Sequence, residues 1–258
     1  MKRTKQIIFL GLLGLLANVL SCSDKSPKEV ALPEEIIPPL SSTASPAEVV
    51  ADAARRLDNK LNYSWATTMK EADGNAGKLG TIEGKAEKGG VTGLSFSVGG
   101  LPVAVCMKGE KGAANAMMGW QTFDQIAQMG GTPAAVVRYL RSSKTPAAET
   151  TFLAGKVKEL TAADGAITGE LQDAAVQDLL LFGTRQSEGE AAPKTTEAKG
   201  AVKFWIKNGA LTKFEVKVSG KVTAGEKESA INRTTTVEIK DVGTTKLVVP
   251  DEAKAKLT

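Results

Sequence analysis

The C-terminal third of the chain constrains the fold most, because its apolar and polar residues alternate over long runs. In VKFWIKNGALTKFEVKVSG, residues 202–220, each half gathers its apolar side chains on one face: Val202, Phe204 and Ile206, then Phe214, Val216 and Val218 with Thr212. Two such runs joined at Asn-Gly predict a β-hairpin with one buried face. A two-residue turn would set Phe204 opposite Lys213, so we expect a three-residue turn, Lys207-Asn208-Gly209, with Gly209 left-handed.

Other parts of the chain carry the same strand signal. Residues 232–240 place one set of side chains on one face (Arg233, Thr235, Val237, Ile239) and a polar set on the other (Asn232, Thr234, Thr236, Glu238, Lys240). Earlier in the chain, short runs bounded by Gly or Pro follow one another: NYSWATTMK, LGTIEGKAEK, VTGLSFSVG and PVAVCMKG. Such runs are typical of antiparallel meanders. Residues 45–258 therefore predict one domain, long enough for a sizeable core.

Helix signals precede and interrupt these strands. Ser45 is a predicted N-cap, Pro46 takes the first helical position, and Glu48 completes a capping box. Residues 122–129 and 132–142 predict two short helices, and DAAVQDLLLFG predicts a third that ends at Gly183. KVKELTAADGAITGEL predicts a hairpin that turns at Asp164-Gly165. Residues 184–198 have no aromatic or large aliphatic side chain and are expected to form a loop.

The order of these elements resembles that of the LolA/LppX-like superfamily of bacterial lipoproteins and lipid carriers. The hairpin FWIKNGALTKFEV and the closing segment IKDVGTTKLVVPDEA, residues 239–253, carry the resemblance. The resemblance implies an α+β fold for residues 45–258. In this fold a curved antiparallel sheet forms an unclosed half-barrel, and helices cover its concave face. In carriers of this group the concave face holds acyl chains.

The N-terminus has the features of an export signal. Lys2, Arg3 and Lys5 precede an apolar run over residues 7–16, which is too short to span a bilayer but fits a signal peptide. Val19-Leu20-Ser21-Cys22 then resembles a bacterial lipobox, although position 20 is usually a smaller residue. We therefore predict a signal peptide over 1–21 and a lipid on Cys22. The alternative is cleavage at another site, which would leave Cys22 as an ordinary thiol.

Removal of the signal peptide changes the charge balance. The full chain has a formal charge of +4, but residues 1–21 hold three basic and no acidic residues, which leaves +1. The basic composition is therefore no evidence for nucleic-acid binding. Residues 22–44 contain four of the ten prolines and predict an extended tether behind the lipidated Cys22. Ser23, rather than Asp, follows Cys22, which favours the outer over the inner membrane, with the domain facing the periplasm.

Enzyme classes find little support in this sequence. The chain has no histidine, which removes His-based triads and most zinc sites. It also lacks the Ser-x-x-Lys, P-loop and G-x-G-x-x-G motifs. Cys106, in the apolar run PVAVCM, is predicted to be a small buried hydrophobe. We expect no catalytic residue, metal or cofactor.

One group of residues is a candidate lining for an apolar ligand. Four of the six methionines fall within residues 107–129, around the helices expected to cover the sheet. Thioether side chains are flexible and polarizable and so adapt to variable apolar ligands. The predicted lining comprises Met107, Met117, Met118, Trp120, Phe123, Ile126, Met129, Val137 and Leu140. The alternative is that these side chains simply fill a core that is short of aromatic residues.

Two functions follow from the sequence. The first is a membrane-anchored envelope lipoprotein that binds a lipid or another apolar ligand on the concave face. The second is a non-catalytic envelope interaction protein with a filled core and no ligand. A soluble shuttle between membranes is disfavoured, because a multiply acylated chain does not leave its bilayer readily. No protein partner can be named from the sequence.

Overall fold

A computed structural model describes residues 44–60, 62–72, 76–87, 89–116, 118–181 and 192–257. These residues belong to one compact unit, Pro39–Thr258. The predicted signal peptide, Cys22 and the tether up to residue 43 lie outside the described residues, as do Met117 and Gly183. The buried apolar residues run from Val50 to Ala253, so the unit has a hydrophobic core of its own.

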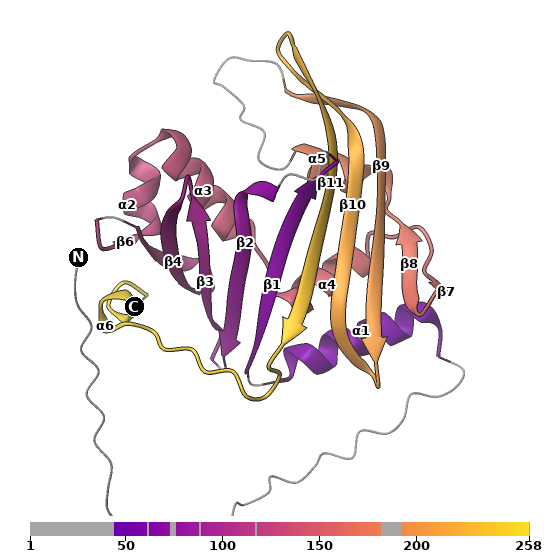
Figure 1. The fold of residues 1–258 in the computed structure, drawn as a ribbon, viewed down its shortest axis with the longest axis horizontal. Coiled ribbons are helices and arrows are strands. Elements are labelled where there is room, and N and C mark those ends of the chain that lie inside the picture. Colours follow the sequence, from indigo (N-terminus) through magenta and orange to yellow (C-terminus); the bar gives the residue numbers. More distant parts are fainter. Residues whose placement is uncertain are drawn as a thin grey trace, which may run out of the picture. The chain divides into compact units, whose positions relative to one another are not determined.

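The described residues form one antiparallel sheet of 11 strands (Figure 1). The strands are β1 Asn62–Glu71, β2 Ala76–Glu87, β3 Val91–Val98, β4 Leu101–Lys108, β5 Lys111–Asn115, β6 Trp120–Thr122, β7 Thr161–Ala163, β8 Ala166–Glu170, β9 Lys194–Lys207, β10 Ala210–Ala224 and β11 Lys227–Lys240. Their order across the sheet is β6-β5-β4-β3-β2-β1-β11-β10-β9-β8-β7. The sheet is thus two meanders joined where β1 pairs with β11, and it stays open because β6 and β7 are not paired with each other.

The described residues also form six helices. They are α1 Pro46–Asp58, α2 Phe123–Gln128, α3 Gly131–Ser142, α4 Pro146–Ala154, α5 Asp173–Leu181 and α6 Asp251–Lys254. Figure 1 shows α1, α4 and α5 behind the strands, and α1 and α5 contact β9 and β10. The predicted α+β fold, an unclosed antiparallel sheet with covering helices, is therefore confirmed. None of the described helices is both long and apolar enough to cross a membrane.

The first helix begins as its sequence predicts. The Ser45 Oγ accepts a hydrogen bond from the Glu48 backbone N–H at 3.3 Å, and the Glu48 carboxylate accepts one from the Ser45 N–H at 2.7 Å. This capping box satisfies donors that the first helical turn leaves without intrahelical partners. Four residues of α1 are buried, Val50, Ala53, Ala54 and Leu57, and this face joins the core beneath β10.

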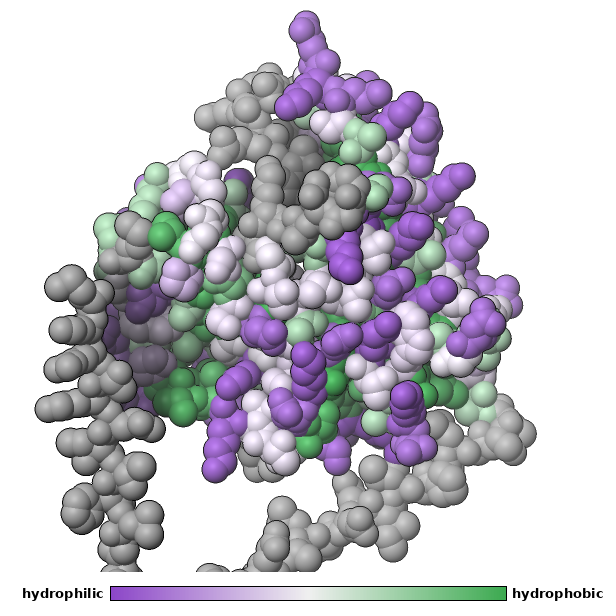
Figure 2. Space-filling view, in the orientation of Figure 1, coloured by the Kyte–Doolittle hydropathy of each residue, from purple (hydrophilic) through white to green (hydrophobic). Residues whose placement is uncertain are grey.

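The alternation of side chains gives the sheet two different faces. The inner face carries the buried side chains, among them Trp65, Val216 and Val237, and packs against the helices. Phe204 and Phe214 are fully buried there, with ring centroids 6.3 Å apart. The outer face carries the alternate positions, which are mostly charged or hydroxylated. Figure 2 shows a largely hydrophilic surface in the view in which the strands lie in front.

The β9–β10 hairpin pairs its phenylalanines as predicted, but its turn and its register differ from the prediction. Phe204 lies opposite Phe214, as the buried pattern requires. The turn, however, has two residues, Asn208 and Gly209, with φ of 51° and 74°, so the predicted three-residue turn is wrong. The register is corrected at Thr212, an extra residue between Leu211 and Lys213 in β10. Its hydroxyl donates to the Trp205 carbonyl oxygen at 3.1 Å.

Part of the segment expected to form a loop, residues 184–198, is a strand instead, and residues 184–191 lie outside the described residues. Residues 194–198 belong to β9 and pair with the end of β10, with Thr195 opposite the buried Val222. A change of register at Glu197, where φ is 54°, joins this extension to the rest of β9. The strand extends because pairing with β10 satisfies its backbone groups, a tertiary effect that its polar composition does not reveal.

Candidate ligand cavity

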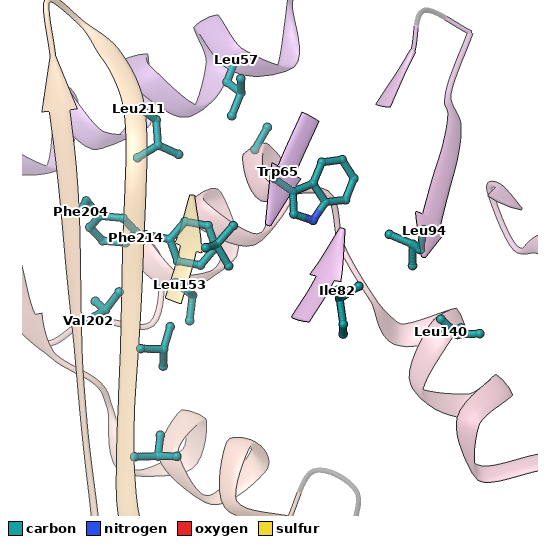
Figure 3. Close-up of a cluster of buried hydrophobic side chains, with 14 of the residues drawn as sticks. Leu57, Trp65, Ile82, Leu94, Leu140, Leu153, Val202, Phe204, Leu211 and Phe214 are labelled. Atoms are coloured by element: carbon teal, nitrogen blue, oxygen red, sulfur yellow. The ribbon is translucent and has the colours of Figure 1, made fainter. Parts of the chain in front are cut away.

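A cavity of about 490 Å³ lies between the inner face of the sheet and the helical cover. The sheet contributes residues from six strands: Trp65, Thr67 and Met69 of β1, Ile82 of β2, Thr92 and Leu94 of β3, Met107 of β4, Val216 and Val218 of β10, and Arg233 and Thr235 of β11. The cover contributes residues of α3, α4, α5 and the 143–145 connection, including Tyr139, Leu140, Glu149, Leu153 and Leu179. Figure 3 shows several of these side chains.

One wall of the cavity is apolar. Trp65, Ile82, Leu94 and Met107 come from four consecutive strands and are each less than a tenth exposed. Trp65 pairs across β1–β2 with Gly84, and a Cβ at Gly84 would overlap the Trp65 indole. Only a residue without a side chain allows the indole to lie against the neighbouring strand. Gly84 therefore fixes the position of the largest side chain in this wall.

A second part of the lining carries a half-buried positive charge. Arg233 stands on the inner face of β11, in line with Thr235 and the buried Val237. One guanidinium nitrogen, Nη2, donates to the Leu179 carbonyl oxygen of α5 at 2.7 Å. Burial lowers the pKa of Arg233 from its ordinary value, against the opposing effect of Glu71. A guanidinium has five N–H donors, so donors remain for a molecule in the cavity.

Glu149 places a carboxyl group in the same lining. It stands in the first turn of α4 and is half-buried. Its backbone N–H donates to the Thr145 carbonyl oxygen at 2.8 Å, whereas its carboxyl group has no hydrogen bond or ion pair with another described residue. Burial raises the pKa of Glu149 to about 7, with Lys144 acting in the opposite direction. Burial and the nearby Glu149 also raise the pKa of Tyr139 to about 12, while Arg233 acts to lower it. Tyr139, Glu149 and Arg233 thus form one polar region of the lining, and further polar residues of the cover, among them Lys144 and Asp178, line the cavity as well.

The raised pKa of Glu149 predicts a pH dependence of stability. An unfolded chain loses this proton near the ordinary value of 4.5, whereas the folded protein holds it up to about pH 7. The folded state therefore binds more protons between these values, and the free energy of unfolding should fall as pH rises through this window. Glu149→Gln should flatten this decline, measured by denaturant titration at pH 5 and pH 8. Glu110→Gln, at an exposed site, is the matched control, and an unchanged slope in Glu149→Gln would contradict the assignment.

Only part of the predicted lining meets at this cavity. Met107 and Leu140 line it directly. Val137 and Phe123 are buried in the adjoining core, where the Phe123 ring occupies the space that a side chain at Gly112 would need. Ile126 is partly buried and packs against the same core without lining the cavity.

The other predicted residues lie elsewhere. Trp120, in β6 at the sheet edge, is half-buried and does not line the cavity. Met118 and Met129 are 70% and 48% exposed and do not line it either. Met117 lies outside the described residues. The methionine-rich segment is therefore not assembled into a single surface.

Sequence reasoning missed the polar residues of the cavity. The alternation in residues 232–240 already places Arg233 on the same face as Val237, which is buried. Charged side chains are rarely buried, so an arginine at an inner-face position is the signal that could have identified Arg233 as a candidate functional residue. Glu149 gave no such signal, because α4 was not predicted. Cys106 is buried, and burial raises its pKa, as expected of an inert thiol. Within the described ranges, no three His, Cys, Asp or Glu residues are grouped so as to hold a metal ion.

Comparison with known proteins finds likenesses in structure only. No protein-family model matches the sequence, and no curated protein matches it. The chain is similar in fold to two mycobacterial proteins. LprF from Mycobacterium bovis is 9% identical with a TM-score of 0.43, over 81% of this chain and all of LprF. Lipoprotein LppX from Mycobacterium tuberculosis is 10% identical with a TM-score of 0.43, over 79% of this chain and 98% of LppX.

A LolA superfamily protein from Nitrosomonas europaea is also similar. It is 11% identical with a TM-score of 0.35, over 83% of this chain and 98% of its own. LppX and the LolA superfamily are the groups that the two sequence segments resemble. At such low identity the likeness concerns the fold alone, and what the cavity binds depends on the residues of this chain.

Proposed function

We propose that this protein binds an amphiphilic lipid in the cavity on the inner face of the sheet. The observation that carries the proposal is a space of about 490 Å³ with an apolar wall and, at one part of its lining, the half-buried side chains of Arg233 and Glu149. This volume is in the range of small-molecule sites in proteins. The acyl chain would contact Trp65, Ile82, Leu94 and Met107, and the polar end would contact Arg233.

The charged residues favour an amphiphile over a purely apolar ligand. A charge that is withdrawn from water costs free energy unless it is paired or hydrogen-bonded. Arg233 is half-buried and donates one hydrogen bond to the Leu179 carbonyl oxygen. An anionic group in the cavity would accept from the remaining guanidinium donors. Glu149, protonated below about pH 7, could donate a hydrogen bond to the same headgroup.

We propose further that the domain is held at a membrane of the bacterial cell envelope. The support is the N-terminal sequence, in which Lys2, Arg3 and Lys5, an apolar run and Val19-Leu20-Ser21-Cys22 follow in order. In this proposal residues 1–21 are a signal peptide, Cys22 carries the lipid, and residues 22–44 form the tether. Ser23 after Cys22 favours the outer membrane and a domain that faces the periplasm.

A binding experiment tests the cavity proposal. The mature-length chain, residues 22–258 with Cys22→Ser, is titrated with a fluorescent fatty acid and with its methyl ester, and its native mass spectrum is recorded after mixing with a lipid extract. We expect saturable binding of both probes. Arg233→Gln should weaken binding of the acid about tenfold or more, because a hydrogen bond to a charged group is lost, and should affect the ester less.

Arg138→Gln serves as the matched control, because Arg138 is exposed on α3 and does not line the cavity. Circular dichroism must first show that both variants are folded. If the wild-type chain binds neither the probes nor any extracted lipid, ligand carriage is wrong, and the envelope interaction module is the function that remains.

A further inference from the structure

Strands β9 and β10 carry lysine at every fourth position on the outer face of the sheet. The lysines are Lys199, Lys203 and Lys207 in β9, and Lys213, Lys217 and Lys221 in β10. Because strand side chains alternate with a period of two, a spacing of four keeps each set on one face. The residues between them, such as Val202, Phe204 and Val216, are buried on the inner face. We call these six residues the lysine face.

The positive charge of the chain is concentrated here. Strands β9 and β10 hold seven lysines and two glutamates, and no aspartate or arginine. The sequence after residue 21 sums to +1, so the residues outside these two strands carry a net charge of −4. Lys221 forms an ion pair with Glu197 at 2.7 Å, and the other five members of the lysine face form no ion pair with a described residue. Two glutamates also lie on this side of the sheet, Glu215 opposite Lys203 and Glu238 opposite Lys213. No acidic residue stands directly opposite Lys199, Lys207 or Lys217, so the face keeps a net positive charge.

An aromatic residue stands within the lysine face. Trp205 is half-buried on the outer side of β9, two positions from Lys203 and from Lys207. Lys213 of the neighbouring strand lies over its ring, 4.0 Å from the ammonium nitrogen to the centroid. Tryptophan and lysine together favour the region between lipid headgroups and acyl chains, where the ring is partly apolar and the amines meet phosphates. In Figure 2 hydrophilic side chains gather over this side of the sheet.

We infer that the lysine face docks on the surface of a lipid bilayer that contains anionic phospholipids. Two adjacent rows of ammonium groups on one sheet face present a broad array of positive charge to such a surface. Each lysine close to it strengthens binding by about fivefold. The face lies on the opposite side of the sheet from the cavity, so docking leaves the cavity lining uncovered. The inference is independent of the ligand proposed above.

Co-sedimentation with vesicles tests this inference. The mature-length chain with Cys22→Ser carries no acyl group, so its binding reports on the folded unit. We expect binding to vesicles of phosphatidylcholine mixed with phosphatidylglycerol, little binding to phosphatidylcholine alone, and loss of binding at high ionic strength. Lys203→Gln/Lys217→Gln should weaken binding about 25-fold. Trp205→Phe should weaken it while leaving the salt dependence unchanged.

The control variant is Lys108→Gln/Lys111→Gln, which removes the same charge from exposed positions in β4 and β5. If both double variants lose binding equally, net charge rather than the lysine face is responsible, and the inference is wrong. The inference is also wrong if the wild-type chain does not bind to anionic vesicles. Binding to an acidic polymer such as heparin without binding to vesicles would equally overturn it.

Discussion

Replacing Gly84 by Val is expected to destabilise the folded unit by about 3 kcal/mol and to disrupt the ligand cavity, because overpacking a core forces shifts of this cost. The Trp65 indole lies directly over Gly84 on the paired strand, and any Cβ at this position overlaps the ring. Trp65 is only 4% exposed and has no outward space to move into. The indole would therefore be displaced toward the cavity that it lines.

The matched control compares alanine variants at Gly84 and at Gly93, which lies on the next strand. A Cβ at Gly93 would meet the Leu247 Cδ1 atom at 2.6 Å, which is the far end of a flexible side chain. Gly93→Ala should consequently cost far less than Gly84→Ala in a denaturant titration. Binding of the fluorescent fatty acid should fall with Gly84→Ala and stay unchanged with Gly93→Ala. Equal costs for the two alanine variants would show that the position of Trp65 does not depend on Gly84.

Cys22→Ala is expected to abolish acylation and to release the protein from membranes. The predicted lipid is attached through the sulfur of Cys22, which alanine lacks, so the effect should be complete. Incorporation of radiolabelled palmitate and fractionation of cell membranes measure the two consequences. Cys106→Ala is the control, because this thiol is buried in β4 and should not affect labelling. If the wild-type chain never incorporates palmitate, the proposed lipid anchor is wrong.

The alternation in the sequence was enough to predict the sheet, because burial on one face leaves a period of two at each strand. The β9–β10 pairing shows the limit of that reasoning. The phenylalanine pair was predicted correctly, but the extra residue was placed in the turn, whereas the chain accommodates it at Thr212. A bulge and a longer turn satisfy the same pattern, so the pattern cannot separate them.

Helix α4 and the polar part of the cavity were not predictable in the same way. The buried residues Pro146, Ala147, Thr150 and Leu153 share one face of α4, but this face includes a threonine, and Phe152 lies exposed on another face. The sequence of α4 therefore shows no clear apolar stripe. Its position is decided by packing against α1. Glu149 enters the cavity lining only through this packing. Its raised pKa is thus a property of the tertiary structure, whereas Arg233 was already marked by its strand.

The pairing of β1 with β11 has a consequence for how the chain reaches its native state. These neighbours are the first and last strands of the sequence, and Ser64 pairs with Lys240 across almost the whole domain. Each meander can assemble from local contacts, but the central pairing must wait until the last strand has been synthesised. Until then β1 has an open edge, which is a template for mispairing with other chains. Completion of the C-terminal strand should therefore be the slow and aggregation-sensitive step of folding.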